Sequence, residues 1–173
     1  MMNYRRNRIQ GGTYFFTVVT AGRTPIFQSA AAVSCLRESF RSVQRRYPFS
    51  IDAIVVLPDH IHCIWSLPDD DAEYSRRWRL IKAGVTKGVQ EIPGWAGQVS
   101  GSIWQKRFWE HTVRDDLDFE RHVDYIHFNP VKHGYVSRAL DWPYSSFHHY
   151  VRDGVLPADW AVSEEALEGV GRE

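Results

Sequence analysis

Two β-rich runs stand almost end to end in this sequence. Residues 51–57 (IDAIVVL) and 61–67 (IHCIWSL) are separated only by Pro58, Asp59 and His60. A connection this short joins antiparallel strands, because parallel neighbours need a crossover of a dozen or more residues. We therefore expect an antiparallel hairpin, around which the rest of the chain has to pack.

Two further segments have strand character. Residues 13–20 (TYFFTVVT) are β-branched and aromatic and lie between glycine-containing turns, which predicts a strand. Residues 108–113 are expected to supply a fourth strand, after a Gly/Ser-rich loop at 94–102. Together with the hairpin, these segments predict a sheet of four strands.

Three segments repeat apolar residues at helical spacing. The first, 29–47, has Ser29 as a plausible N-cap and Pro48 as a stop, and the second covers 74–90. The third covers 118–128, after which Pro130 and Gly134 are expected to break the pattern. A short segment at 142–150 is also expected to be helical.

The order strand, helix, hairpin, helix, strand, helix predicts an α+β fold. It is typical of a ferredoxin-like or RRM-like antiparallel sheet with helices packed on one face. A chain of 173 residues and 20.1 kDa fits one compact domain. We divide it into a basic N-terminal arm (1–10), a single domain (11–150) and a C-terminal tail (151–173).

Composition excludes several classes of protein. No apolar run approaches the length that crosses a bilayer, and the N-terminus lacks the apolar stretch of a signal peptide. Two cysteines supply neither a disulfide framework nor a four-cysteine zinc site. These features predict a cytoplasmic protein with reduced thiols.

Charge is balanced in sum but not along the chain. The 21 basic and 21 acidic residues give no net charge, which argues against coating nucleic acid by bulk electrostatics. Several basic clusters nevertheless adjoin Tyr or Trp, a pairing that single-strand binders use for phosphate contact and base stacking. For any one cluster, a solvated helix face is the commoner explanation. The DNA-binding candidates are Arg5, Arg6, Arg8, Lys106 and Arg107.

The histidine pair His60 and His62 carries the first chemical signal. Alternate residues of a strand share a face, so both imidazoles point the same way and can hold one divalent ion. Ile61 between them points to the opposite face and can anchor the strand in the core. Taken alone, His-apolar-His is more often a pair of half-buried histidines than a metal site.

The second chemical signal is YIHFNP, where Tyr125 and Asn129 lie four residues apart on one helix face. An amide oxygen is an acceptable ligand for Mg²⁺ or Mn²⁺, so Asn129 can complete a His-His-Asn site beside the tyrosine hydroxyl. The alternative makes Asn129 a helix C-cap and Tyr125 a core aromatic. The residues alone leave both interpretations open.

Taken together, the motifs LPDHIHCIW, WQKRFWEH and YIHFNPVKHGYV resemble a known family. They are similar to those of the REP-associated tyrosine transposases, in the single-tyrosine HUH superfamily of insertion-sequence transposases. The resemblance runs in order from GGTYFFTVVT at residue 11 to WPYSSFHHY ending at residue 150.

The resemblance implies a mechanism and a substrate. His60 and His62 match the metal ligands, Tyr125 matches the nucleophile, and Asn129 stands at the third ligand position, where the wider superfamily often has Gln. The implied activity cleaves and rejoins single-stranded DNA at repetitive palindromic hairpins through a 5′-phosphotyrosine, with Mg²⁺ or Mn²⁺, as a monomer or homodimer.

Two other functions remain as alternatives. A non-catalytic RRM-like module would bind nucleic acid through an exposed sheet face and form no covalent adduct. A metal-dependent phosphoesterase would activate water at His60 and His62, with His111 or His127 as further ligands. Glu110 and His111, within the expected fourth strand, could approach the metal, but we do not assign them a role.

Overall fold

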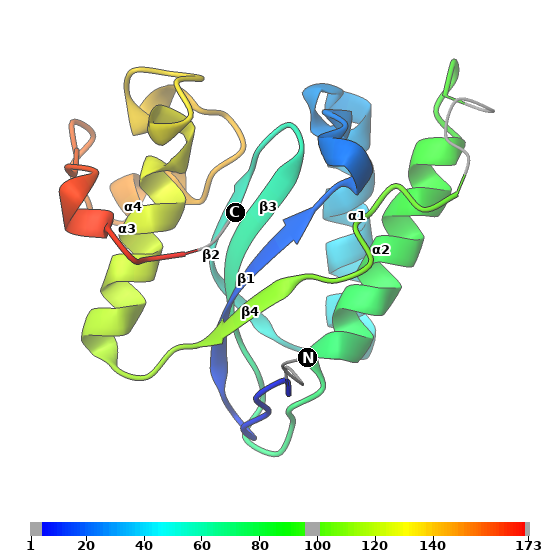
Figure 1. Cartoon of the computed structure of the whole chain (residues 1–173), viewed down its shortest axis with the longest axis horizontal. Helices are drawn as coiled ribbons and strands as arrows, with labels where there is room; N and C mark the ends of the chain where they lie inside the picture. Colours follow the sequence, from blue (N-terminus) through cyan, green and yellow to red (C-terminus); the bar gives the residue numbers. More distant parts are fainter. Residues whose placement is uncertain (1–4, 96–100, 172–173) are drawn as a thin grey trace.

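A four-stranded antiparallel sheet forms the centre of the chain, in a computed structural model that describes residues 5–95 and 101–171. Its strands lie in the order β2-β3-β1-β4, so β3 and β1 are central (Figure 1). β2 and β3 form the expected hairpin, and β1 pairs antiparallel with both β3 and β4. The predicted α+β class is therefore confirmed. The strands are β1 (Thr13–Val19), β2 (Ser50–Val56), β3 (His60–Ser66) and β4 (Trp109–Thr112).

Three long helices and one short one surround the sheet. Ser29 caps the first as predicted, its hydroxyl accepting a hydrogen bond from the Ala32 backbone N–H at 3.3 Å. No helix within the described ranges has the length and apolar character needed to cross a membrane. The helices are α1 (Ala30–Arg46), α2 (Tyr74–Gln90), α3 (Asp116–Lys132) and α4 (Phe147–Arg152), with 3-10 turns at Ala21–Arg23, Ile26–Gln28, Ala139–Asp141 and Glu165–Leu167.

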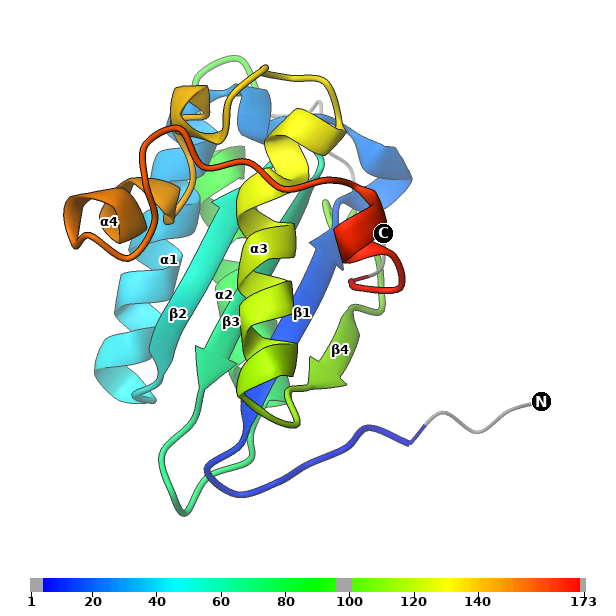
Figure 2. The ribbon, with the colours of Figure 1, turned by 90° about the vertical axis from the view of Figure 1, so that its left-hand side faces the viewer.

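Helices cover both faces of the sheet. α1 and α2 pack together on one face, as expected, whereas α3 lies on the opposite face (Figures 1 and 2). The prediction of helices on one face is thus corrected for α3. The reason lies in β3, where every residue from His60 to Trp65 is buried, so that both faces of the strand require a cover.

Two helix boundaries differ from the prediction. α3 continues through Pro130 to Lys132, because a proline in the last turn forfeits only one backbone hydrogen bond, and Gly134 follows with a positive φ of 72°. The short helix expected over 142–150 begins only at Phe147, and Ser145 instead pairs with Val55 at the edge of β2. Residues 96–100 of the expected 94–102 loop lie outside the described part of the chain.

The segments before and after residues 11–150 also make contacts with the domain. In the N-terminal arm, the Tyr74 hydroxyl donates to the Asn7 carbonyl at 2.7 Å, and the Ile9 backbone N–H donates to the Tyr14 hydroxyl at 2.6 Å. In the C-terminal tail, Leu167 and Val170 are buried in the same apolar cluster as α3. Both segments therefore add to the packing of the domain.

Arg77 of α2 is a buried cation that joins three parts of the chain. Its guanidinium donates to both carboxylate oxygens of Asp71, at 3.0 and 2.7 Å, and to the backbone carbonyls of Tyr47 and Pro48 at the end of α1. Its side chain is only 2% exposed, so these acceptors replace its hydration shell.

We expect Arg77→Met to lower the free energy of unfolding by about 3 kcal/mol, because it removes the cation that pairs with the Asp71 carboxylate and the donor to the Tyr47 and Pro48 carbonyls. Urea denaturation followed by circular dichroism measures this difference. Arg79→Met, at an exposed position of the same helix, is the matched control and should change stability by less than about 0.5 kcal/mol. Equal stability of the two variants would contradict the structural role of Arg77.

Candidate functional site

β3 presents two histidines to the face that α3 covers. His60 and His62 are 1% and 0% exposed, and their ring centroids lie 4.8 Å apart with planes at 81°. Ile61, Cys63 and Trp65 point to the other face, into the core beneath α1 and α2. The alternation predicted for the HIH segment is confirmed.

Each histidine is held through its Nδ1 atom. His60 Nδ1 lies 2.6 Å from Asp59 Oδ1, and His62 Nδ1 lies 2.9 Å from the Thr17 hydroxyl of β1. A carboxylate can only accept, so Nδ1 of His60 carries a proton, and in the neutral imidazole the lone pair is then on Nε2. The Nε2 atoms of both rings are buried, and they are the atoms that would bind a metal.

Asp59 is part of this arrangement and was not identified from the sequence. Besides His60 it binds Arg23, whose NH1 lies 3.3 Å from Asp59 Oδ2. Burial acts to raise the pKa of Asp59, but the hydrogen bonds from His60 and Arg23 hold it below its usual value. A charged Asp59 orients the imidazole and increases its basicity, as carboxylates behind metal-binding histidines do. Its position directly before His60 was the available signal.

α3 brings Tyr125 to the histidines. The Tyr125 ring is 3% exposed, and its centroid lies 5.2 Å from that of His62. Asn129 follows one turn later and is fully buried, including its Oδ1 atom. The C-cap of α3 is His133, so Asn129 lies inside the helix and its interpretation as a cap is wrong.

Two further residues of α3 and its C-cap adjoin the cluster. The Lys132 ammonium lies 5.1 Å from the Tyr125 ring centroid, and the His133 ring centroid lies 5.2 Å from that of His60. Sequence reasoning missed both. The helical period was the available signal, because Lys132 is seven residues after Tyr125 and His133 is four after Asn129.

The C-terminal segment lies against Tyr125. Gly171 approaches so closely that a side chain there would collide with the Tyr125 ring, and Gly171 also has a φ of 70°. Leu167 and Val170 pack into the apolar cluster beside it. Only a glycine combines this backbone conformation with this approach.

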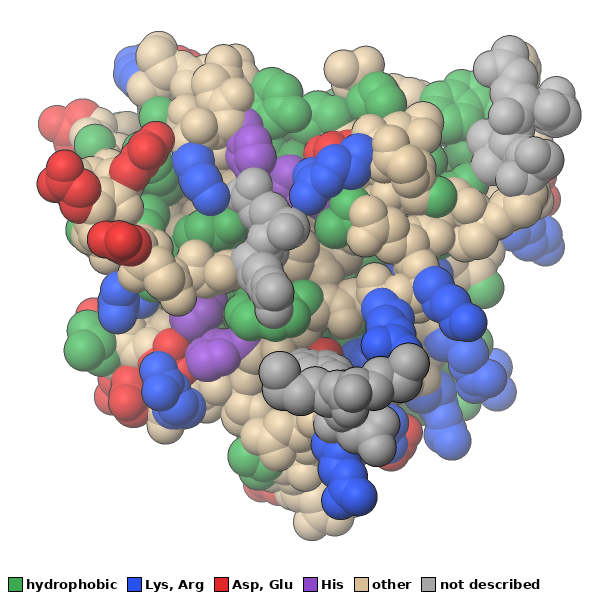
Figure 3. Space-filling model, in the orientation of Figure 1, with side chains coloured by type: hydrophobic (Ala, Val, Ile, Leu, Met, Phe, Trp, Pro, Cys, Tyr) green, Lys and Arg blue, Asp and Glu red, His purple; other side chains and the backbone are tan. Residues whose placement is uncertain are grey.

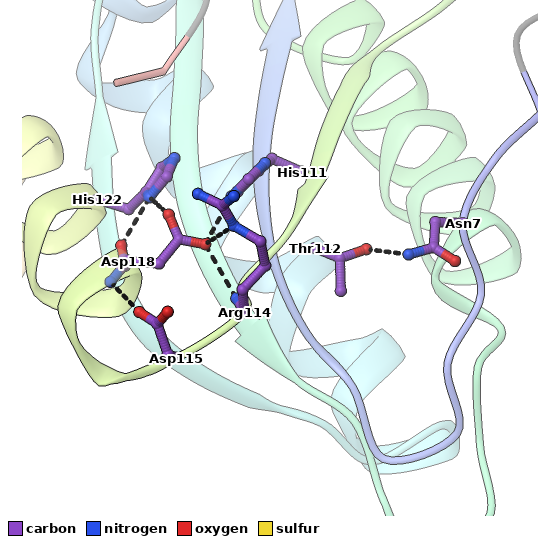
Figure 4. A network of polar contacts seen from close by, with 7 residues as sticks. All are labelled: Asn7, His111, Thr112, Arg114, Asp115, Asp118 and His122. Carbon is purple, nitrogen blue, oxygen red and sulfur yellow. Dashed lines mark hydrogen bonds and ion pairs between the residues drawn. The ribbon is translucent and has the colours of Figure 1, made fainter. Parts of the chain in front are cut away.

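A second group of histidine and carboxylate side chains lies at the start of α3 (Figure 4). Asp118 Oδ2 accepts from His111 Nε2 at 2.8 Å and from the Arg114 backbone N–H at 2.9 Å, and His122 lies beside its other oxygen. Burial acts to raise the pKa of Asp118, but His111 and Arg114 lower it to about 2. This network joins β4 to α3, and its ligand atoms lie within 4.8 Å of one another.

The structure separates the other candidates from the histidine pair. His127 Nε2 lies 2.8 Å from the Ser146 hydroxyl, beside α4. Glu110 lies on the α2 side of the sheet, and its carboxylate accepts a hydrogen bond from Arg6 of the N-terminal arm at 3.1 Å. Arg6 also stacks on Phe108, at 3.9 Å from the ring centroid.

The remaining DNA-binding candidates lie at the surface. Arg8 pairs with Glu73 at 3.0 Å, and its side chain is 45% exposed. The residues Arg5, Lys106 and Arg107 are exposed.

The chemistry of the donor set fits a small divalent cation. Two imidazole nitrogens and an amide oxygen, supplied by β3 and α3, are ligands that first-row metals and Mg²⁺ accept. The His62 ring lies next to the phenol of Tyr125, so an ion held by the histidine pair would be adjacent to a potential nucleophile.

Known proteins share this arrangement of sequence and fold. A REP-associated tyrosine transposase from Escherichia coli (strain K12) is 46% identical over 163 residues, covering 93% of this chain and 92% of the relative. A protein from Haemophilus influenzae, named "Putative REP-associated tyrosine transposase", is 42% identical over 168 residues, covering 92% of this chain and 93% of the relative.

A solved structure also matches. A REP-associated tyrosine transposase bound to a REP hairpin aligns with a TM-score of 0.84 and 45% identity, covering 94% of this chain and 93% of the other. The family described as "Transposase IS200 like" matches residues 8–129. With most of its length matched by this family and by relatives more than 40% identical, the chain belongs to the IS200-like transposases.

Proposed function

We propose that the protein nicks and rejoins single-stranded DNA at repetitive palindromic hairpins, with Tyr125 as nucleophile. The observation that carries the proposal is the buried cluster in which β3 supplies His60 and His62 and α3 supplies Tyr125. The family is metal-dependent, which agrees with the presence of two histidines that can bind a metal ion.

The residues divide the reaction between them. His60, His62 and Asn129 would hold Mg²⁺ or Mn²⁺, which supplies Lewis-acid stabilisation of charge on the scissile phosphate. Tyr125 attacks phosphorus, so a tyrosyl O–P bond forms while the bond from phosphorus to the 3′ oxygen breaks. The phenol gives up its proton and the departing 3′ oxygen takes one up, which leaves a 5′-phosphotyrosine and a free 3′-hydroxyl. Attack by another 3′-hydroxyl reverses these steps and rejoins the strands without a nucleotide cofactor.

Lys132 supplies positive charge beside the nucleophile. A free tyrosine hydroxyl has a pKa of about 10, so the phenolate is scarce at neutral pH. The Lys132 ammonium, 5.1 Å from the Tyr125 ring centroid, would stabilise negative charge on the approaching phosphate. Lys132 therefore acts as an electrostatic partner of Tyr125 in this mechanism.

The hairpin requires a basic surface, and one lies over α2 and the segment leading into β4 (Figure 3). A groove of about 540 Å³ there is lined by Lys82, Lys87, Lys106 and Trp104, with no carboxylate among its lining residues. We assign hairpin contact to this face, together with Arg107 and the candidates Arg5, Arg6 and Arg8 of the N-terminal arm. The hairpin-bound relative supports this substrate class.

The two alternatives fit the structure less well. An RRM-like module needs an open sheet face, but among the described residues α1 and α2 cover one face and α3 covers the other. A water-activating phosphoesterase has no use for a tyrosine beside the histidines, and His111 and His127 bind other partners. We propose that the protein acts as a monomer or homodimer.

We expect Tyr125→Phe to lose cleavage of a labelled single-stranded hairpin by at least about 1,000-fold, because the phenol oxygen is the nucleophile. A denaturing gel with Mg²⁺ or Mn²⁺ detects both the cleaved strand and the covalent adduct. Tyr47→Phe, at the end of α1, is the control and should cleave like the unaltered protein. Cleavage that persists in Tyr125→Phe would favour activated water instead.

Metal binding is tested by thermal stability. We expect Mn²⁺ to raise the melting temperature of the unaltered protein and of His111→Ala, because an ion that binds only the folded state stabilises it. The double variant His60→Ala/His62→Ala should show no such shift. A shift that survives in this variant but disappears in His111→Ala would place the ion at the Asp118 network.

A further inference from the structure

A continuous series of rings leads away from the proposed metal site. The centroid of His133 lies 5.2 Å from His60 and 5.8 Å from Tyr135, and Tyr135 lies 5.3 Å from Trp142. Trp142 in turn lies 6.5 Å from Tyr144. Tyr135 is 45% exposed, and the side chains of His133, Trp142 and Tyr144 are partly exposed. Neighbouring rings, with planes at 31° to 89°, therefore form a track from His60 to the protein surface.

The track ends at a basic groove between α1 and the segment before α4. The groove has a volume of about 440 Å³, and the guanidinium carbon of Arg37 lies 5.6 Å from the Tyr144 ring centroid. Apolar side chains including Leu36 and Ile54 form part of its lining, and Arg37 and Arg41 contribute positive charge. No carboxylate lines it, so its charge suits a polyanion.

Backbone pairing fixes the rings that connect the site to the groove. Val56 N–H donates to the Tyr144 carbonyl at 2.9 Å, and Ser146 N–H donates to the Ile54 carbonyl at 2.8 Å. The Trp142 indole N–H donates to the Val56 carbonyl at 3.0 Å. Trp142 and Tyr144 are therefore attached to the edge of β2, in the same hairpin that carries the histidines.

We propose that this track binds the unpaired DNA strand that flanks the hairpin. Bases stack along His133, Tyr135, Trp142 and Tyr144, and phosphates contact Arg37 and Arg41. Stacking on aromatic faces accepts any base, and a cationic rim follows the backbone, which is how single strands are held without a fixed sequence. The inference rests on the proposed function for its substrate. It places the flank at the β2 edge of the sheet. The groove lined by Lys82, Lys87 and Lys106, here called the Lys106 face, lies beside the segment that leads into β4 at the other edge.

Two differences from the Lys106 face favour a single strand here. Neighbouring rings link the groove at Tyr144 to His60, whereas the Lys106 face contains three lysines suited to duplex phosphates and a single aromatic residue, Trp104. A paired stem keeps its bases stacked on each other, so it gains little from the partly exposed ring of Tyr135. The unpaired flank gains from both the rings and the arginines.

Binding is measured by fluorescence anisotropy in Tyr125→Phe protein with chelator, so that neither cleavage nor metal contributes. Labelled hairpins carry a 5′ tail, a 3′ tail or no tail. We expect Arg37→Gln/Arg41→Gln and Tyr135→Ser each to weaken binding of a tailed hairpin by roughly 10-fold, for at least one polarity. Binding of the hairpin without a tail should change by less than about 2-fold. Arg45→Gln, exposed on α1 outside the groove, is the matched control.

The outcomes separate the track from the proposed catalysis. Selective loss of tailed-hairpin binding supports the track even if the unaltered protein fails to cleave, in which case only the catalytic proposal falls. Equal weakening with and without a tail, or no weakening in either variant, overturns the track whatever the cleavage assay shows. Circular dichroism of both variants confirms that a loss of binding does not come from unfolding.

Discussion

The burial of both faces of β3 is the constraint on which the other features depend. A strand that is buried on one side only can leave its second face to solvent, but here six consecutive residues from His60 to Trp65 are all buried. The odd-numbered side chains fill the core under α1 and α2, and the even-numbered ones meet α3. Sheet order, helix placement and the enclosure of the histidines follow from this single strand.

The geometry of the candidate site depends on how α3 is attached to the sheet. Asp118 binds His111 of β4 near the start of the helix, and His127 binds Ser146 near its end. Burial lowers the pKa of His127 to about 3, so this ring stays neutral and its contact with Ser146 is a hydrogen bond between uncharged groups. Tyr125 lies between these two attachments, which fix its distance from His62.

Local sequence patterns predicted the helices and strands. How these elements pack on one another depends on long-range contacts, which local patterns do not report. The hairpin, the Ser29 cap and the shared face of His60 and His62 follow from period, capping and turn length. The position of α3 on the second face does not, because periodicity reports that a helix has an apolar side and not which surface it meets. Pro130 was expected to end α3, but the loss of one terminal hydrogen bond is outweighed by the packing of that turn.

The same division holds for the site. Tyr125, His60 and His62 came from motif and spacing, whereas the contacts of Asp59, Lys132 and His133 depend on chain segments that meet only in the folded protein. Net charge likewise concealed the basic surfaces, since acidic groups gather elsewhere. Spatial separation of charge is a property of the fold and is absent from the composition.

The stacked indoles of Trp65 and Trp78 add a spectroscopic property. Their centroids lie 4.4 Å apart with planes at 17°, between β3 and α2, and both side chains are fully buried. Chromophores this close couple their excited states, so the circular dichroism of the pair reports the packing of α2 on β3. This signal arises on the face opposite Tyr125. A variant that no longer cleaves DNA but retains the coupled-indole spectrum has therefore lost its reactive groups and kept its fold.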